Sequence, residues 1–219
     1  MTDAHCHVSC GDPAIRELLV GRDFFGVHPW DAESWTGDLR AWLESKLDAP
    51  APGTRLPGVG EIGLDRLKVR DISPRMREVF ATQLQVALER RRPVVLHGAK
   101  CWGQVVKAIQ AAVPAPHHDQ TFLFHGFSRS DGLLPDIVAL NGYVSVGPAV
   151  LNDHAVNYRA LVGKIPLDRL LLETDRTSAN AADCPSIVDV AAKVAALRDL
   201  TLDELEAQTD RNVAAFSPS

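Results

Sequence analysis

The chain has 219 residues, 46% of them hydrophobic, and a formal net charge of -5 at pH 7. This length predicts one domain over residues 1–219, and the charge excludes a general attraction to nucleic acid or to an anionic membrane, so any phosphate must bind at a local site. The four cysteines lack zinc-knuckle spacing, and the sequence shows no basic and apolar leader and no apolar run long enough to cross a bilayer. These features predict a reduced, cytoplasmic protein.

Strands and helices are predicted in alternation, because short apolar runs rich in Val, Phe and Leu alternate with segments whose apolar residues recur at intervals of three and four. Asp12 as N-cap and Pro13 at the first helical position predict a first helix that ends at Gly21. Strands are predicted near Asp3, Phe25, Glu61, Leu96, Phe124, Val144 and Leu172. Later helices are predicted from Asp31 to Leu47, from Ser73 to Arg90, at 103–113, 133–140 and 153–163, and in two closing segments, the last capped by Thr201 and Glu204.

This alternation predicts an α/β fold with a parallel sheet. Strands buried on both faces fit such a sheet, and polar residues repeated at strand ends fit a closed, TIM-like (β/α) barrel better than an open sheet. Seven predicted strands are one fewer than the usual eight, so the barrel is predicted to be incomplete or distorted. In such barrels the carboxyl ends of the strands carry the chemistry.

Candidate metal ligands lie at several of these strand ends. His5 and His7 are two residues apart and share one strand face, so both imidazoles can reach one ion, while Asp3 or the backbone can orient a ring from behind. Taken alone, the His-x-His pair could arise by chance. Glu61 lies among glycines, which would leave room for an ion or a ligand, and its carboxylate could bridge two ions or form a buried ion pair.

Three further residues extend this pattern. His97 and His125 each end a largely apolar run, where a lone histidine is more often a core residue, but two histidines at equivalent strand ends favour ligation. Asp175 follows the last predicted strand. Its carboxylate could hold a metal, accept a proton from a metal-bound water, or cap the next segment.

Cations and aromatic residues also follow strand ends. A ring of cations is predicted near the mouth of the barrel, where it would suit an anionic substrate, although each cation could be an ordinary solvated loop charge. Its members are Arg66, Lys68, Arg70, Lys100, Arg129 and Arg176. The aromatic residues beyond strand ends could stack on bases or pack beneath loops; they are Trp30, Trp102 and Phe127.

Six segments resemble, in order, the motifs of the TatD family of metal-dependent hydrolases, whose studied members include DNases. They are Asp3-Ala4-His5-Cys6-His7, Gly26-Val27-His28-Pro29, Gly60-Glu61-Ile62-Gly63-Leu64-Asp65, Val94-Val95-Leu96-His97, Phe124-His125-Gly126-Phe127-Ser128 and Leu171-Leu172-Glu173-Thr174-Asp175. The resemblance implies that His5, His7 and Asp175 hold one divalent ion and that His97 and His125 hold another. It further implies that Glu61 bridges both ions, that a bridging hydroxide attacks phosphorus while Asp175 handles the proton, and that His28 faces the phosphate. Asp65, the last residue of the third segment, is predicted to bind substrate together with Arg66, Lys100, Arg129 and Arg176.

Three departures from the family pattern fall near the cleft. Between His7 and Phe24 the family has room for an additional strand and helix, whereas this chain has room for only one short helix, so the resemblance implies that one βα unit is missing near the N-terminus. Arg176-Thr177-Ser178 replaces a small residue, proline and an aromatic, and Gly126 stands where cysteine is common. The sequence therefore predicts a deoxyribonuclease or phosphodiesterase that uses two Zn, Mg or Mn ions, acts on DNA or another phosphodiester, and needs no membrane and no obligate protein partner. The alternatives are metal-dependent hydrolysis of an amide or an ester, including an aminoacyl ester, and a noncatalytic metal-binding protein whose shortened N-terminal half lost the cleft.

Overall fold

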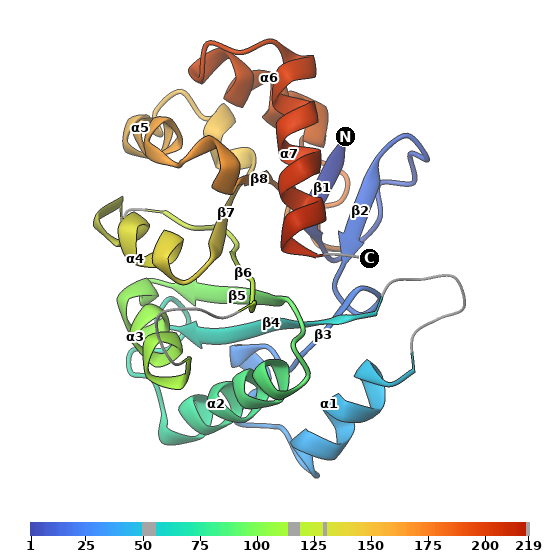
Figure 1. Ribbon diagram of the computed structural model, residues 1–219, viewed down its shortest axis with the longest axis vertical. Helices are drawn as coiled ribbons and strands as arrows, with labels where there is room; N and C mark the ends of the chain where they lie inside the picture. Colours follow the sequence, from blue (N-terminus) through green and yellow to red (C-terminus); the bar gives the residue numbers. More distant parts are fainter. Residues whose placement is uncertain (50–55, 114–118, 129–130, 218–219) are drawn as a thin grey trace.

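The computed structural model describes residues 1–49, 56–113, 119–128 and 131–217, which form a barrel of parallel strands flanked by helices (Figure 1). Strands β1 and β2 pair with each other, and β3 to β8 form a second parallel sheet in chain order. Val20 bridges Phe24 at one seam between the two sheets, and at the other the Asp175 N–H donates to the His5 carbonyl at 3.1 Å. The strands are β1 (Thr2–Cys6), β2 (Arg16–Leu19), β3 (Phe24–Phe25), β4 (Gly58–Asp65), β5 (Val94–Ala99), β6 (Phe122–Phe124), β7 (Gly142–Val146) and β8 (Leu170–Leu172).

The described residues contain eight strands, so the predictions of seven strands and of a helix ending at Gly21 are wrong. The segment predicted as that helix contains β2, which pairs with β1 in the register Thr2 to Arg16. Asp12 caps only a turn, where its Oδ1 accepts from the Ala14 N–H at 2.9 Å. Pairing with β1 overrides the local helical signal. The elements missing near the N-terminus are the helices that would join β1 to β2 and β2 to β3.

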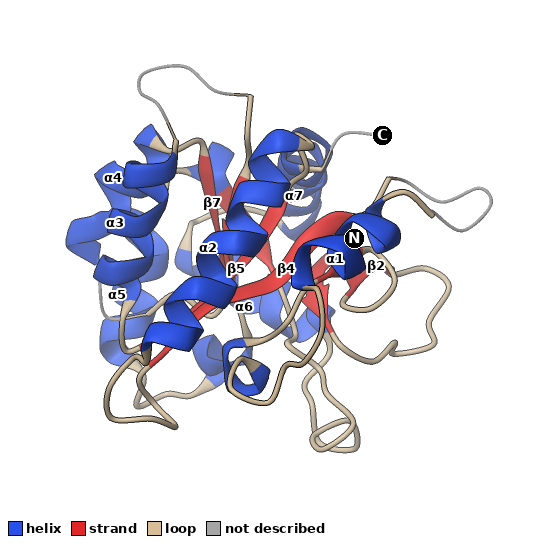
Figure 2. Cartoon of the chain, turned by 90° about the horizontal axis from the view of Figure 1, so that it is seen from below, coloured by secondary structure: helices blue, strands red, loops and turns tan. Residues whose placement is uncertain are grey.

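The helices lie outside the strands (Figure 2), and most follow the predicted order. Ser73 caps the long α2 by accepting from the Met76 N–H, and Thr201 and Glu204 form the predicted capping box. The N-cap of α1 is Asp38, not Asp31, which lies in a short 3-10 turn. The helices are α1 (Leu39–Leu47), α2 (Pro74–Glu89), α3 (Trp102–Ala112), α4 (Leu134–Ala139), α5 (Val156–Lys164), α6 (Ile187–Leu197) and α7 (Leu202–Phe216). No helix of the described residues has the length and apolar character to cross a membrane.

The inside of the barrel is apolar in its middle and polar at the carboxyl ends of the strands, which form its mouth. Val95, Leu123, Tyr143 and Leu171 belong to one buried cluster, which Phe216 of α7 joins. Side chains two residues apart in a strand share a face. The residues two positions after those four therefore point inward at the carboxyl end of the barrel, and they are His97, His125, Ser145 and Glu173.

The glycines beside Glu61 make room for protein rather than for a ligand. A Cβ added to Gly63 would lie 2.0 Å from the carbonyl oxygen of His97, and one added to Gly60 would lie 2.7 Å from the Cβ of Val95. The expectation that these glycines admit an ion or a ligand is therefore wrong, because β5 fills the space.

Gly63→Ala is expected to lower the free energy of unfolding by about 3 kcal/mol, because Gly63 combines the close approach of β5 with a φ of +150°. Urea denaturation followed by circular dichroism measures the change. Gly103→Ala in α3 is the control, since an added Cβ there meets nothing within 4 Å. Equal midpoints for the two variants would contradict the argument.

Candidate metal centre

Glu61 of β4 lies at the centre of a group of histidines at the mouth of the barrel. The side chain is buried, and its two oxygens face different rings. Oε1 lies 2.5 Å from His97 Nδ1 and 2.5 Å from His125 Nε2. Oε2 lies 3.6 Å from His5 Nε2 and 3.5 Å from His7 Nε2. One carboxylate thus faces two pairs of imidazoles that come from β1, β5 and the end of β6.

Asp175 closes the group from the β8 side. Its Oδ1 lies 3.6 Å from His5 Nε2 and 3.5 Å from His7 Nε2. The residue has a φ of +48°, and its backbone N–H is bonded to the His5 carbonyl, so the left-handed turn directs the carboxylate towards β1. The side chain is 47% exposed and can therefore meet both the histidines and a bound substrate.

The residues of this centre fit divalent metal ions. Ligand atoms of His5, His7 and Glu61 lie within 4.8 Å of one another, as do those of His5, His125 and Asp175. The His5 Nε2 is buried without a hydrogen-bond partner, which is costly for a polar atom unless an ion engages it. Imidazole nitrogens with carboxylate oxygens suit Zn, Mn and Fe. The structure brings all six sequence-predicted ligands together.

A second layer of side chains orients the central histidines. Asp65 is fully buried, and its Oδ2 lies 2.9 Å from His97 Nε2 and accepts from Trp30 Nε1 at 2.8 Å. Its Oδ1 accepts from two backbone N–H groups. A direct substrate contact, as predicted for Asp65, therefore does not agree with the structure, because all of its acceptors face protein. Asp65 instead fixes the His97 ring with Nδ1 towards Glu61.

Glu173 is a residue of the centre that the sequence reasoning missed. Its Oε2 lies 3.8 Å from His125 Nδ1 and accepts from the Ser145 hydroxyl at 2.6 Å, while its Oε1 accepts from the Gly126 N–H at 2.7 Å. Burial raises the pKa of Glu173 to about 7. The signal in the sequence was its position two residues after the inward Leu171.

Asp3 ties β1 to the loop after β8, rather than orienting a histidine ring from behind. Its carboxylate accepts from the Thr174 N–H at 3.0 Å and from the Thr174 hydroxyl at 2.6 Å. Through Thr174 it supports the neighbouring Asp175.

His28 lies beside the centre as a hydrogen-bond donor. Its Nδ1 accepts from the Trp30 N–H at 3.1 Å, so in the neutral ring the proton sits on Nε2, which lies 3.4 Å from Glu61 Oε1. In this tautomer His28 can donate to an anionic oxygen, whereas a proton on Nδ1 would free Nε2 to join Glu61 and His97 as a further group of possible metal ligands.

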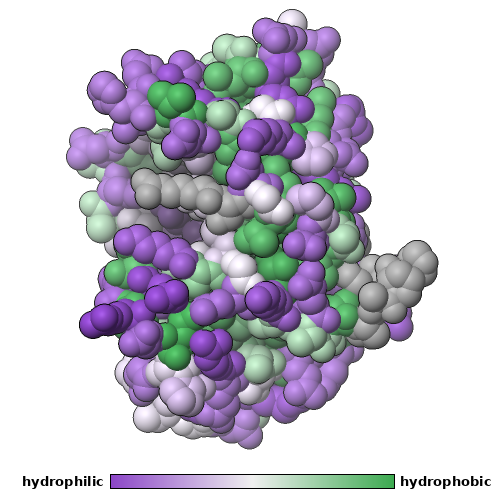
Figure 3. Space-filling model, turned by 90° about the vertical axis from the view of Figure 1, so that its left-hand side faces the viewer, coloured by the Kyte–Doolittle hydropathy of each residue, from purple (hydrophilic) through white to green (hydrophobic). Residues whose placement is uncertain are grey.

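The cations predicted at the mouth differ in their surroundings. Arg66 and Lys100 are exposed, and each follows the carboxyl end of its strand, β4 or β5. These strands run towards the left in Figure 1, and the face of the molecule on that side is mostly hydrophilic (Figure 3). Lys68 lies with Nζ 3.2 Å from the centre of the Trp30 ring. The Arg176 guanidinium donates to the Ala181 carbonyl at 2.6 Å within its own loop. Arg129 lies outside the described residues.

The three aromatic residues beyond strand ends separate into two groups. Trp102 and Phe127 are buried, and their rings pack against each other at 5.5 Å, so they do not offer a surface to bases. Trp30 is 48% exposed at the rim of the cleft over the centre, and it remains a candidate for stacking.

Without metal, the charges of the centre are balanced by protons. Burial alone would raise the pKa of Glu61, but the surrounding histidines, His125 first, hold it well below its usual range. Burial alone would lower the pKa of His125, yet Glu61 and the neighbouring carboxylates raise it to about 10. Asp175 and Glu61 raise the pKa of His7 to about 9. Both rings are therefore protonated at neutral pH.

Binding of Mn or Zn at pH 7 is expected to release about two protons per chain, because His7 and His125 must lose theirs to become ligands. Affinity should rise by about tenfold per pH unit for each proton displaced, up to the pKa of each ring, and fall as the pH drops. Calorimetric titrations in two buffers of different ionisation enthalpy give the proton count. Affinity that is independent of pH between 6 and 8 would contradict this charge assignment.

The chain has known relatives. A sequence profile described as TatD related DNase matches residues 21–217. The uncharacterized metal-dependent hydrolase YabD of Bacillus subtilis (strain 168) is 28% identical over 207 residues, 90% of this chain and 78% of that protein. The 3'-5' ssDNA/RNA exonuclease TatD of Edwardsiella piscicida is 30% identical over 151 residues, 68% of this chain and 55% of that protein. The crystal structure of YJJV, a TatD homolog from Escherichia coli K12, matches with a TM-score of 0.76 at 23% identity over 95% of this chain and 79% of that chain, a likeness of fold.

Proposed function

Because this chain belongs to the TatD related DNase family and is a metal-dependent hydrolase, we propose that it hydrolyses phosphodiester bonds of single-stranded nucleic acid at a centre of two divalent ions. The observation that carries the proposal is the placement of Glu61, whose two oxygens face two pairs of imidazoles. In this assignment His5, His7 and Asp175 would hold one ion, His97 and His125 would hold the other, and Glu61 would contribute to both sites. Bound ions would neutralise charge on the phosphodiester and lower the pKa of the attacking water.

The side chains around the centre have separate roles in this proposal. His28 donates its Nε2 proton to a phosphate oxygen. Asp175, which is partly exposed beside His5 and His7, accepts the proton of the attacking water. Asp65 and Glu173 keep the His97 and His125 rings in place.

Substrate approach in this proposal depends on the exposed side of the centre. Arg66 and Lys100 attract the phosphates of the strand, and Arg129 and Arg176 remain proposed substrate contacts of the loops after β6 and β8. Hydrolysis of an amide or an ester, and a noncatalytic metal-binding role, are the competing outcomes. The cytoplasmic location and the lack of an obligate protein partner stay predictions.

The first test is hydrolysis by metal-free protein to which Mg, Mn or Zn is restored in turn. End-labelled single-stranded DNA should be cleaved at least about a hundredfold faster with metal than without it, and chelation should reverse the gain. A panel of single-stranded RNA, double-stranded DNA, an aminoacyl ester and an aryl amide is assayed in parallel. Cleavage of the ester or the amide alone would replace the phosphodiesterase assignment. A metal-loaded protein that cleaves none of them would be a metal-binding protein without this activity.

A further inference from the structure

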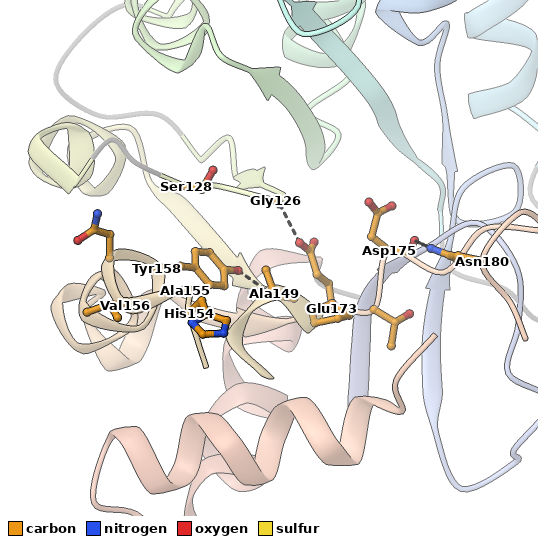
Figure 4. A pocket seen from close by; sticks show the side chains of 14 residues that line it. Gly126, Ser128, Ala149, His154, Ala155, Val156, Tyr158, Glu173, Asp175 and Asn180 are labelled. Carbon is orange, nitrogen blue, oxygen red and sulfur yellow. Dashed lines mark hydrogen bonds between the residues drawn. The ribbon is translucent and has the colours of Figure 1, made fainter. Parts of the chain in front are cut away.

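Two cavities meet at the metal centre, and Trp30 lies in the wall of one of them. The larger cavity has a volume of about 800 Å³, lies among the loops after β6, β7 and β8, and has Asp175 at one end (Figure 4). The smaller, of about 440 Å³, is the cleft over the centre, and Trp30 lines it together with Glu61 and His97. Trp30 thus lies among the proposed ligands but cannot hold an ion itself, because an indole N–H only donates.

The Trp30 side chain is half exposed, yet its one polar group faces inward. Trp30 is 48% exposed, and its indole N–H donates to Oδ2 of the fully buried Asp65 at 2.8 Å. The same oxygen lies 2.9 Å from His97 Nε2. On the other side of that ring, Nδ1 lies 2.5 Å from Glu61 Oε1. A chain of contacts therefore runs from the rim of the cleft to the central carboxylate.

The two oxygens of Asp65 are held in different ways. Oδ1 accepts from the backbone N–H groups of Leu67 and Lys68, at 2.6 and 2.8 Å. Within the described part of the chain, the hydrogen bonds of Oδ2 are to side chains alone, those of Trp30 and His97. A buried oxygen that loses one of two donors is left undersatisfied, so the carboxylate would shift and the His97 ring with it.

Trp30 is itself held in place by its neighbours. Its backbone N–H donates to His28 Nδ1 at 3.1 Å, and the two rings meet edge to face with their centres 4.5 Å apart. The Lys68 ammonium lies 3.2 Å from the centre of the indole ring, in a cation–π contact. Because Lys68 covers one face of the ring, less of the indole is left for a base to stack on. These contacts favour a positioning role over a stacking role.

We propose that Trp30 is a positioning residue of the metal centre, which acts through Asp65 on the His97 ring and so sets the affinity for the ion that His97 holds. The assignment of His97 to one of two ions rests on the function proposed above. Removing a group that orients a metal-binding histidine costs roughly 10- to 100-fold in metal affinity. Trp30 acts one contact further out, so the expected loss is about fivefold to tenfold.

The first test measures the binding of two Mn ions to the metal-free protein by calorimetry. Phe keeps an aromatic ring at position 30 but has no N–H. Trp30→Phe is expected to weaken one of the two binding steps by about fivefold or more and to leave the other within about twofold of the parent chain. Unchanged affinity in both steps would overturn the proposal. Equal losses in both steps would also overturn it, since they indicate a general loosening of the barrel.

Trp35→Phe is the matched control for this substitution. Trp35 Nε1 is buried without a hydrogen-bond partner among the described residues, and its ring packs against Trp42 with the ring centres 4.8 Å apart. The control therefore removes an indole of the same size without removing a hydrogen bond. Both Mn-binding steps should match those of the parent chain.

A double-mutant cycle tests whether Asp65 transmits the effect. Asp65→Asn keeps the shape of the side chain and should weaken the same step by about tenfold. If Trp30 acts through Asp65, Trp30→Phe should cost less than about a further twofold in the Asp65→Asn background. A further loss as large as that in the parent background would overturn the proposed route.

Hydrolysis separates this proposal from the function on which it rests. At saturating Mn, Trp30→Phe should cleave single-stranded DNA with a kcat/KM within about twofold of the parent's, and its loss should appear only at limiting Mn. A loss at every Mn concentration would indicate contact with substrate and overturn the positioning role. If the Mn-binding results hold but no strand is cleaved, the phosphodiesterase function alone would be overturned. A parent chain that binds fewer than two ions would overturn both.

Discussion

Glu61→Gln is expected to lower kcat/KM for single-stranded DNA by about a thousandfold or more. Gln has nearly the shape of Glu but no charge, and only one of its terminal atoms can accept a hydrogen bond or hold an ion. In the structure both oxygens of Glu61 face imidazoles, at 2.5 Å on one side and at 3.5 to 3.6 Å on the other. The variant therefore loses the group that joins the two halves of the centre.

Metal content distinguishes this loss from a general defect. The parent chain should retain about two ions after dialysis, and Glu61→Gln should retain about one or fewer, as measured by mass spectrometry of the metals. Glu89→Gln is the control, because Glu89 is an exposed carboxylate at the end of α2 that pairs with Arg40 and belongs to none of the groups of possible metal ligands among the described residues. If Glu61→Gln kept its ions and more than about a tenth of the parent's activity, the bridging role of Glu61 would be wrong.

The placement of the central histidines could be predicted from local rules. His97 and His125 each end an apolar run, and the two-residue period of a strand puts them on the inward face above Val95 and Leu123. The order of strands and helices after Phe24 could be predicted in the same way, since long periodic segments and N-caps such as Ser73 are local features.

Other features depend on contacts between distant segments. β2 has the caps of a helix, and only its pairing with β1 makes it a strand. Asp65 is the last residue of its strand, where a substrate-binding carboxylate could lie, but its partners, Trp30 and His97, are 35 and 32 residues away. Likewise, the glycine spacing around Glu61 could not reveal that β5 fills the space beside it.

Asp175→Asn is expected to reduce kcat for single-stranded DNA by about a thousandfold at saturating metal, with a smaller change in KM. The residue has a φ of +48°, a conformation that Asn adopts readily, so the turn and its bond to the His5 carbonyl should persist. The substitution removes a negative charge 3.5 to 3.6 Å from His7 and His5 and, in the function proposed above, removes the carboxylate that accepts the proton of the attacking water. If the proposed roles of Asp175 are right, the substitution weakens the proton acceptor and one metal ligand together.

The two effects of Asp175→Asn can be separated by titrating metal. If Asp175 acted only as a ligand, excess Mn would restore activity, whereas loss of a proton acceptor persists at every metal concentration and flattens the rise of kcat with pH. Asp183→Asn in the same loop, where the backbone N–H bonds to the Asn180 carbonyl, is the control and should leave kcat within about twofold of the parent. Full activity of Asp175→Asn at saturating Mn would remove Asp175 from proton transfer. A chain with metal bound but no hydrolysis before or after the substitution would point to a noncatalytic protein, in which Asp175 serves the ion alone.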